Sequence, residues 1–238
     1  MARSFYHEHP ETLVLETEVV DALPGRVRLA GSPFYPGGGG QLADHGRLAW
    51  SGGVLAVTGF EAAAGGYWHL LEDAEAELSG AVRAEVDPEF RAMMRALHTG
   101  THILNALVFQ HFNGALVTGA QLGADQTARL DFDLPEADNE RLRALEGPIN
   151  DVIRQSLVVR DDYVALTEAY EVPGLIRSKS VTPPPTPDGK IRIVEIVGLD
   201  RQACGGTHLA ATGDSRPVRI VKIENKGRHN RRIRIGIP

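Results

Sequence analysis

Two pairs of potential metal ligands stand out in this sequence. His98 and His102 lie four residues apart in a stretch with helical periodicity, so both imidazoles leave the same helix face one turn apart. Cys204 and His208 are also four apart, in the segment QACGGTH, where two glycines favour a tight turn over a helix. One thiolate and three imidazoles form a tetrahedral donor set that suits Zn²⁺. The spacing therefore predicts a zinc site built from all four residues.

The combination of the two pairs carries more weight than either pair alone. Two histidines on one helix face are commonly solvated, and a lone cysteine is commonly a small core residue. Cys204 is the only cysteine of the 238 residues, which excludes a disulfide within the chain. That this single cysteine falls inside one of the two motifs favours a metal site.

The elements that must position these ligands fall into two parts. Residues 12–86 contain short strand-like runs that are separated by turns, with no helix between them, and this is typical of a small barrel. At residue 87 the pattern changes, because Asp87-Pro88-Glu89 is a helix start and apolar residues then keep helical spacing up to Asn113-Gly114. We predict an N-terminal barrel-like domain over 1–87 and a zinc-binding domain over 88–238.

The second part mixes helices with strands that do not alternate regularly. A second helix is expected over 136–157, kinked or broken at Gly147-Pro148. Residues 182–190 form a proline-rich loop. Strands are expected over the apolar runs 128–134, 191–197, 218–225 and 231–237. This order predicts an α+β fold rather than a doubly wound sheet.

The charge is distributed unevenly along the chain. The net charge is −6, and residues 1–90 hold five basic and fourteen acidic residues. Residues 216–238 hold eight basic residues against Glu224 alone. Such asymmetry suggests a face for a polyanion, although a solvated basic strand would explain it equally well.

No apolar run approaches the length of a membrane span or of a secretory signal. We therefore expect a soluble cytoplasmic protein without a membrane partner, and no obligate protein partner is evident.

A glycine-rich segment interrupts the strands of the first part. It reads GSPFYPGGGGQLADHG over residues 31–46, and four consecutive glycines are too flexible for a regular element. One interpretation is a loop whose backbone approaches a ligand or another domain closely. The other is a long hairpin loop, and the segment alone does not decide between them.

Several motifs together resemble a known family. They are HTGTHILNA (98–106), QACGGTH (202–208), FYPGGGGQLADHG (34–46), KIENKGRHNRRIRI (222–235) and ALVTGAQLGADQTARLDFDL (115–134). They resemble the editing domain of alanyl-tRNA synthetase and, more closely, its free-standing relatives, the alanyl-tRNA trans-editing (AlaX) family. The resemblance implies a hydrolase that removes serine, with glycine as a further candidate, from mischarged alanine tRNA. It also implies that His98, His102, Cys204 and His208 hold zinc. Because the basic residues of 216–238 lie close in sequence to Cys204 and His208, we expect the partner to be the acceptor stem of this tRNA.

Three positions depart from the family pattern. Gly100 stands where an alanine is usual, which loosens the helix without moving either ligand. Gly37 replaces an acidic residue before the glycine run. Thr118 aligns with a glutamine of the synthetase versions, although Gln121 is close by.

Further residues are expected around the metal. Thr207 and the backbone amides at Gly205 and Gly206 are candidates for stabilising an oxyanion, although these glycines would equally serve only to permit the turn. Small polar residues beside the metal would recognise the serine hydroxyl. The residues expected to contact the substrate are Thr99, Thr101, Thr118, Gln121, Gly38, Gly39, Gln41, Asp44, Arg231 and Arg232.

Several interpretations stay open at this point. A shell closed by four protein ligands is typical of structural zinc, whereas catalytic zinc keeps an open position. The metal would therefore either activate water or position the substrate. The alternatives for the whole chain are an editing module of the threonyl-tRNA synthetase type and a non-catalytic tRNA-binding module with structural zinc. A zinc peptidase is disfavoured, because no glutamate lies between the two histidines of the helix.

Overall fold

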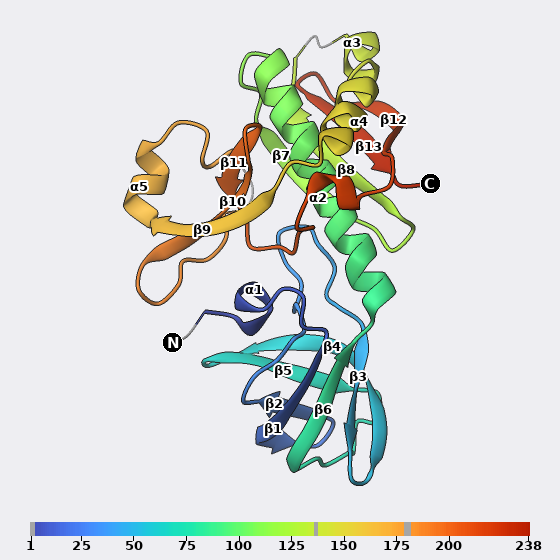
Figure 1. The fold of residues 1–238 in the computed structure, drawn as a ribbon, viewed down its shortest axis with the longest axis vertical. Helices are drawn as coiled ribbons and strands as arrows, with labels where there is room; N and C mark the ends of the chain where they lie inside the picture. The colour runs from blue at the N-terminus through green and yellow to red at the C-terminus, as the bar shows by residue number, and fades with distance from the viewer. Residues whose placement is uncertain (1–2, 136–137, 179–181) are drawn as a thin grey trace. The chain divides into compact units, whose positions relative to one another are not determined.

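The computed structural model describes residues 3–135, 138–178 and 182–238 (Figure 1). The chain forms two compact units. One runs to Gly38 and resumes over Leu42–Ala92, and the other comprises Gly39–Gln41 and Met93–Pro238. The division falls within helix α2 (Pro88–His111). The three residues Gly39–Gln41 therefore belong with the second unit, although they lie in the middle of the first unit's sequence.

The first unit is a closed antiparallel β-barrel, preceded by the short helix α1 (Phe5–Glu8). The strands follow the order β1-β2-β5-β4-β3-β6 around the barrel. Their bounds are β1 (Val14–Leu23), β2 (Arg26–Leu29), β3 (Gly46–Trp50), β4 (Gly53–Ala63), β5 (Gly66–Leu71) and β6 (Gly80–Val86). The predicted N-terminal barrel is confirmed.

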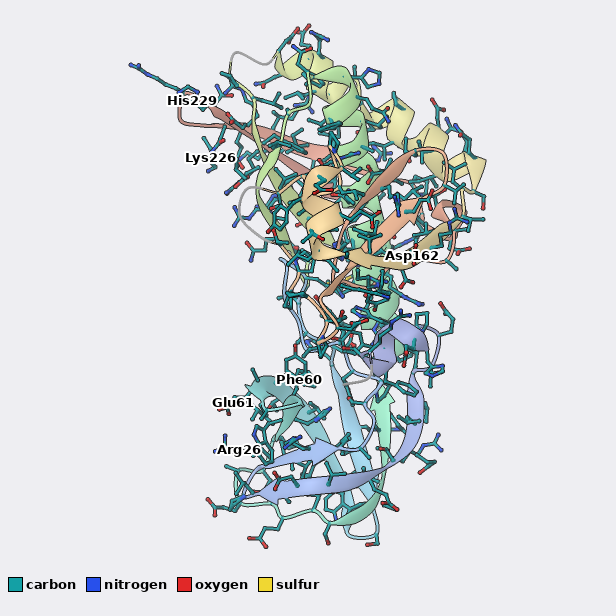
Figure 2. The ribbon with its side chains drawn as sticks, turned by 90° about the vertical axis from the view of Figure 1, so that its left-hand side faces the viewer. Arg26, Phe60, Glu61, Asp162, Lys226 and His229 are labelled. Atoms are coloured by element: carbon teal, nitrogen blue, oxygen red, sulfur yellow. The ribbon has the colours of Figure 1, made fainter. Side chains whose placement is uncertain are left out.

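Alternation of apolar and polar residues explains why these segments form a barrel. In β6, Val82, Ala84 and Val86 are buried, whereas the intervening Arg83 and Glu85 form an ion pair of 2.6 Å. Successive side chains of a strand point to opposite faces, so one face fills the barrel interior. Charged pairs also join strands on the outside of the barrel (Figure 2). One joins Arg26 of β2 to Glu61 of β4 at 2.7 Å, across the intervening strand β5.

A histidine lies in the interior of the barrel and should make the stability of the protein depend on pH. His69 is 3% exposed, and its Nε2 lies 2.7 Å from the Ser32 hydroxyl oxygen. Burial lowers the pKa of His69 to about 4. In the unfolded chain His69 is protonated near pH 6.5, whereas in the folded barrel it stays neutral until about pH 4. The free energy of unfolding should therefore decrease as the pH falls from about 6.5 to 4. The pKa difference corresponds to about 3 kcal/mol.

Denaturant unfolding between pH 7 and pH 4 measures this contribution. His69→Gln keeps hydrogen-bonding groups but cannot titrate, so its unfolding free energy should decrease less steeply than that of the wild type over this range. The difference between the two curves isolates His69 from the other titrating groups. Parallel curves would contradict the assignment.

The second unit contains two sheets and several helices (Figure 1). A four-stranded sheet has the order β12-β13-β8-β7, and a three-stranded sheet has the order β11-β10-β9. The strands are β7 (Val117–Leu122), β8 (Thr127–Asp133), β9 (Val159–Ala165), β10 (Lys190–Ile196), β11 (Asp200–Ala203), β12 (Arg219–Lys226) and β13 (Asn230–Gly236). Besides α2, the helices are α3 (Asn139–Arg143), α4 (Glu146–Gln155), α5 (Leu166–Glu171) and the 3₁₀ helix η1 (Thr212–Asp214). The predicted α+β class is confirmed.

Helix α2 begins and ends where the sequence predicts. The Asp87 carboxylate accepts hydrogen bonds from the backbone N–H groups of Glu89 and Phe90, which caps the first turn. After His111, both Asn113 and Gly114 have positive φ angles, of 52° and 73°, which end the helix. The buried apolar face comprises Met94, Leu97, Leu104 and Val108, among others. Within the part of the chain that the structure describes, no helix has the length and apolar character to cross a membrane.

Helix α2 packs against the apolar face of the four-stranded sheet. A Cβ atom at Gly100 would lie 3.4 Å from Ile235 Cδ1 and 3.5 Å from Val218 Cγ2, which is ordinary van der Waals contact. The structure therefore has room for the alanine that is usual at this position in the family that the sequence resembles.

The second predicted helix differs in detail from the structure. It consists of α3 and α4, and the break lies at Ala144 and Leu145 rather than at Gly147-Pro148. Pro148 is accommodated because it lies in the first turn of α4, where a backbone N–H would have no partner within the helix. Residues 136–137 of the prediction lie outside the described residues.

Candidate metal centre

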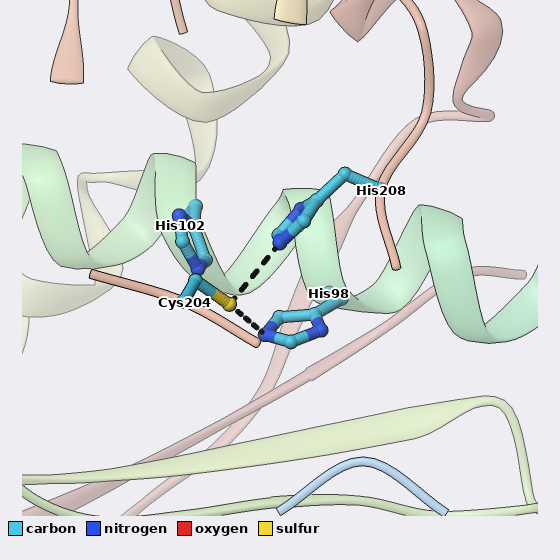
Figure 3. Close-up of side chains that lie close together, drawn as sticks. All are labelled: His98, His102, Cys204 and His208. Carbon is cyan, nitrogen blue, oxygen red and sulfur yellow. Dashed lines mark hydrogen bonds between the residues drawn. The ribbon is translucent and has the colours of Figure 1, made fainter. Parts of the chain in front are cut away.

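The two ligand motifs meet in the interior of the second unit (Figure 3). Helix α2 presents His98 and His102, and the loop that follows β11 presents Cys204 and His208. All four side chains are buried, and one ligand atom of each lies within 4.8 Å of all the others. Cys204 Sγ lies 3.4 Å from His98 Nε2 and 3.3 Å from His208 Nε2. We refer to these residues as the four-residue cluster.

The spacing of the donors fits a tetrahedral ion. Zinc bonds of about 2.3 Å to sulfur and about 2.0–2.1 Å to nitrogen, at tetrahedral angles, place the two donor atoms roughly 3.5 Å apart. The two sulfur–nitrogen separations of Cys204 agree with this value. The four-residue cluster is thus able to hold a metal ion, and its mixture of sulfur and nitrogen donors suits zinc.

Burial keeps the imidazoles in the form that a cation needs. It lowers the pKa of His98 to about 3 and the pKa values of His102 and His208 well below their usual range, and the Arg192 guanidinium adds to each shift. Each ring is therefore neutral at physiological pH and retains a nitrogen lone pair. Burial raises the pKa of the Cys204 thiol. A bound cation would favour its thiolate form.

Two of the three histidines have an oxygen partner at the nitrogen that faces away from the cluster. His98 Nδ1 lies 2.7 Å from the side-chain oxygen of Gln41, and His208 Nδ1 lies 3.3 Å from the Thr99 hydroxyl. The same hydroxyl accepts a hydrogen bond from the backbone N–H of Leu209. Such partners orient metal-bound histidines. Thr99, which the sequence suggested as a substrate contact, lies beside a ligand in this role.

The third histidine faces a buried carboxylate. His102 Nδ1 lies 3.9 Å from Asp200 Oδ2, and the Asp200 side chain is 1% exposed. Gln202 donates a hydrogen bond of 2.6 Å to the same oxygen, and Arg177 lies 2.5 Å from the other oxygen of Asp200. Burial raises the pKa of Asp200, and the Arg177 charge opposes that shift. Sequence reasoning missed Asp200 and Arg177, because neither belongs to a motif whose spacing predicts a contact with His102.

Buried polar contacts hold the Cys204–His208 turn in place. Arg192 donates through Nη1 to the backbone carbonyls of Cys204 (3.1 Å) and Gly206 (2.9 Å). The backbone N–H of Gly206 donates to Cys204 Sγ at 3.4 Å. A Cβ atom at Gly206 would lie 2.1 Å from His98 Cε1, so only glycine fits under the His98 ring.

The other predicted catalytic groups already have partners inside the protein. The backbone N–H of Thr207 donates to the Gln41 side-chain oxygen (3.0 Å), and its hydroxyl accepts from the Gln41 nitrogen (2.8 Å). The amides of Gly206 and Thr207 are thus directed at the site's own atoms rather than into an open space. The Thr101 hydroxyl donates to the backbone carbonyl of His98.

Four of the residues that were expected to contact the substrate lie in the four-stranded sheet. Thr118 lies 3.5 Å from the Asn230 side chain, and Gln121 accepts a hydrogen bond from Arg129. Arg232 makes two hydrogen bonds to the Asp131 carboxylate, of 2.6 and 2.7 Å. Arg231, the next residue back along β13, donates to the carbonyl of Asn230. The partners named here for Thr118, Gln121 and Arg232 are thus residues of the same four-stranded sheet.

The remaining candidates of the glycine loop fall on both sides of the division between the units. In the first unit, the Asp44 carboxylate accepts hydrogen bonds from the backbone N–H of Tyr35 and from the Arg91 guanidinium, and both charged side chains are buried. The Tyr35 hydroxyl donates to the carbonyl of Gly38. Asp44 therefore holds the glycine-rich loop in place through its contacts with Tyr35 and Arg91. Gly39 belongs to the second unit, and no atom of the described residues lies within 4 Å of where its Cβ would be.

Comparison with known proteins identifies the family. Residues 191–234 match the threonyl and alanyl tRNA synthetase second additional domain. The chain is 32% identical to the alanyl-tRNA editing protein AlaX-M of Saccharolobus solfataricus, over 94% of this chain and 97% of that protein. It is 36% identical to AlaX-M of Methanosarcina barkeri over 84% of each chain. It is 33% identical to the alanine–tRNA ligase of Korarchaeum cryptofilum, over 90% of this chain but only 24% of the ligase.

These matches extend from the barrel through the four-residue cluster. The matches thus define a chain related to the threonyl and alanyl tRNA synthetase second additional domain and to alanine–tRNA ligases. The chain belongs to the AlaX-M family of alanyl-tRNA editing proteins. This confirms the resemblance that the sequence motifs indicated.

Proposed function

We propose that this protein is a zinc-dependent trans-editing hydrolase that deacylates alanine tRNA mischarged with serine, with glycyl-tRNA(Ala) as a further candidate substrate. The observation that carries the proposal is the buried four-residue cluster in a chain that is similar to AlaX-M proteins over nearly its whole length. Residues 88–238 would form the editing domain. The reaction would take place in the cytoplasm, where aminoacyl-tRNA is used.

The chemistry needs an electrophilic centre and oriented donors. Zinc in the cluster would supply Lewis acidity, either to a water molecule or to the ester carbonyl of the substrate. The chain's own residues would keep the three imidazoles neutral by burial and would orient His98 through Gln41 and His208 through Thr99, while Asp200 faces His102 at 3.9 Å. The Thr207 hydroxyl accepts from Gln41, so its own hydrogen is available for a substrate oxygen. Thr207 therefore remains our candidate donor.

The partner proposed for this site is the acceptor stem of alanine tRNA. The β12–β13 hairpin carries most of the basic residues of 216–238, and Lys226 lies near its tip (Figure 2). Part of this charge is neutralised within the protein, since Arg232 pairs with Asp131 and Lys222 lies 3.1 Å from Glu224. A phosphate contact by Arg232 would have to compete with Asp131. The RNA contribution of Arg231 and Arg232 therefore stays a prediction.

Deacylation of labelled seryl-tRNA(Ala), with alanyl-tRNA(Ala) as the matched substrate, tests the proposal. The seryl ester should be hydrolysed and the alanyl ester largely spared, because a buried polar contact to a hydroxyl can discriminate by about 10⁴-fold. A chelator should stop the reaction, and added Zn²⁺ should restore it. Equal rates on the two esters would contradict editing.

The same measurement separates the alternatives. Binding of tRNA without release of amino acid would indicate a non-catalytic module with structural zinc, which the closed set of four protein donors would also fit. Preferred cleavage of seryl-tRNA(Thr) would indicate an editing module of the threonyl type.

A further inference from the structure

Gln41 lies against the four-residue cluster although it is far from the ligands in sequence. It follows the four glycines 37–40, and its side chain is 3% exposed. Its Oε1 lies 2.7 Å from His98 Nδ1 and 3.0 Å from the backbone nitrogen of Thr207. Its Nε2 donates to the Thr207 hydroxyl at 2.8 Å. One amide group thus contacts both ligand motifs.

The orientation of this amide determines the protonation of His98. A backbone N–H can only donate, so the Gln41 atom that faces Thr207 must be the oxygen. The same oxygen faces His98 Nδ1, and Nδ1 must therefore carry the hydrogen of the neutral ring. The other nitrogen, Nε2, then presents its lone pair, and this is the atom that lies 3.4 Å from Cys204 Sγ.

We propose that Gln41 is a positioning residue that fixes His98 in the tautomer able to bind a cation through Nε2. The inference rests on the metal site of the proposed function, but not on the reaction. It assigns to Gln41 a contact with a metal ligand rather than the contact with substrate that the sequence suggested.

The glycine run explains how Gln41 reaches the cluster. Gly40 has a φ of +90°, and a Cβ atom at this position would lie 2.5 Å from the carbonyl oxygen of Ala120. The carbonyl of Gly40 in turn accepts a hydrogen bond of 2.7 Å from the backbone N–H of Leu122. The loop backbone is thus held close to β7, where only glycine fits. Of the two interpretations of this loop, the close backbone approach is the one that the structure supports.

Two substitutions distinguish orientation from simple packing. Glutamate at position 41 offers oxygens that can accept from both His98 Nδ1 and Thr207 N, so Gln41→Glu should keep metal affinity within about threefold of the wild type. Leucine has a similar volume but no acceptor, so Gln41→Leu should weaken metal affinity about 10- to 100-fold, the range typical of outer-shell partners. A packing role predicts the opposite order, because leucine would fill the space and glutamate would add a buried charge.

The dissociation constants of the two variants for Co²⁺ show which of them binds metal more tightly, without any activity assay. Competition with a chelator gives the constant, and the thiolate-to-cobalt absorption band reports ligation by Cys204. Gln155→Leu is the matched control, since this glutamine is exposed at the end of α4, and it should bind Co²⁺ like the wild type. Thermal unfolding of each metal-free protein establishes that the variants are folded.

A second measurement reads the tautomer directly. Nitrogen-15 shifts of the metal-free wild type should show His98 protonated at Nδ1, and Gln41→Leu should shift the ring toward the Nε2 form. Equal Co²⁺ affinity of Gln41→Leu and wild type, or an Nε2-protonated His98 in the wild type, would overturn the role of Gln41 alone. A wild type that binds neither Co²⁺ nor Zn²⁺ would overturn the metal site and this inference together.

Discussion

Cys204→Ala and His102→Ala should each leave the protein with almost no zinc and should slow deacylation of seryl-tRNA(Ala) by more than about a hundredfold. Loss of a direct ligand removes one corner of the site, so the effect should exceed the 10- to 100-fold range that applies to outer-shell partners. Zinc content and kcat/KM are measured on the same preparation. The two losses should occur together if the metal takes part in the reaction.

The matched control for these variants is His111→Ala. His111 lies at the end of the same helix but is exposed. Its replacement should leave zinc content and rate close to the wild type. Circular dichroism of each variant would separate loss of the metal from loss of the fold. A zinc-free Cys204→Ala protein that hydrolyses its substrate at the wild-type rate would exclude a metal-dependent reaction.

Gly206→Ala should have nearly the same effect as loss of a ligand. The added methyl group would lie 2.1 Å from His98 Cε1, 2.4 Å from His98 Nδ1 and 2.7 Å from Gln41 Oε1. His98 cannot move aside without leaving the cluster, so we expect metal affinity and deacylation rate to fall by more than about a hundredfold. The strain should also lower the unfolding free energy by roughly 1–3 kcal/mol.

The neighbouring glycine provides the control within the same turn. Among the described residues, the atom nearest to a Cβ at Gly205 would be Pro183 Cβ, at 3.6 Å, which is ordinary contact. Gly205→Ala should therefore retain zinc and activity within about threefold of the wild type. If the two alanine variants behaved alike, the close approach of the His98 ring to Gly206 would not be the reason for the second glycine of CGGTH.

Local spacing makes the four ligands predictable from the sequence. Residues i and i+4 of a helix share a face, and this rule alone places His98 and His102 together. The glycines between Cys204 and His208 indicate a turn for the second pair. The start of α2 at Asp87-Pro88 is predictable for the same reason, since a capping acid acts on the next three residues.

Contacts between distant segments are not predictable in this way. The sequence indicated Gln41 as a substrate contact, and its contact with His98 depends on how the glycine loop is arranged. Asp200 faces His102 through the position of strand β11 and belongs to no motif. Strand β9 was missed because its acidic residues Asp161 and Asp162 mask the apolar pattern of a strand. Arg232 was assigned to RNA from the charge of the segment alone. Its cross-strand partner, Asp131, is visible only in the register of β13 with β8.

The cluster joins segments that are about a hundred residues apart in sequence, helix α2 and the turn after β11. An ion held at this point would act as a reversible cross-link and would restrict the unfolded chain much as a disulfide does. A covalent bridge closing a loop of this length contributes about 4–5 kcal/mol through the entropy of the unfolded chain. In a chain whose single cysteine excludes an internal disulfide, the availability of the metal would thus set the folding stability of the protein as well as its chemistry.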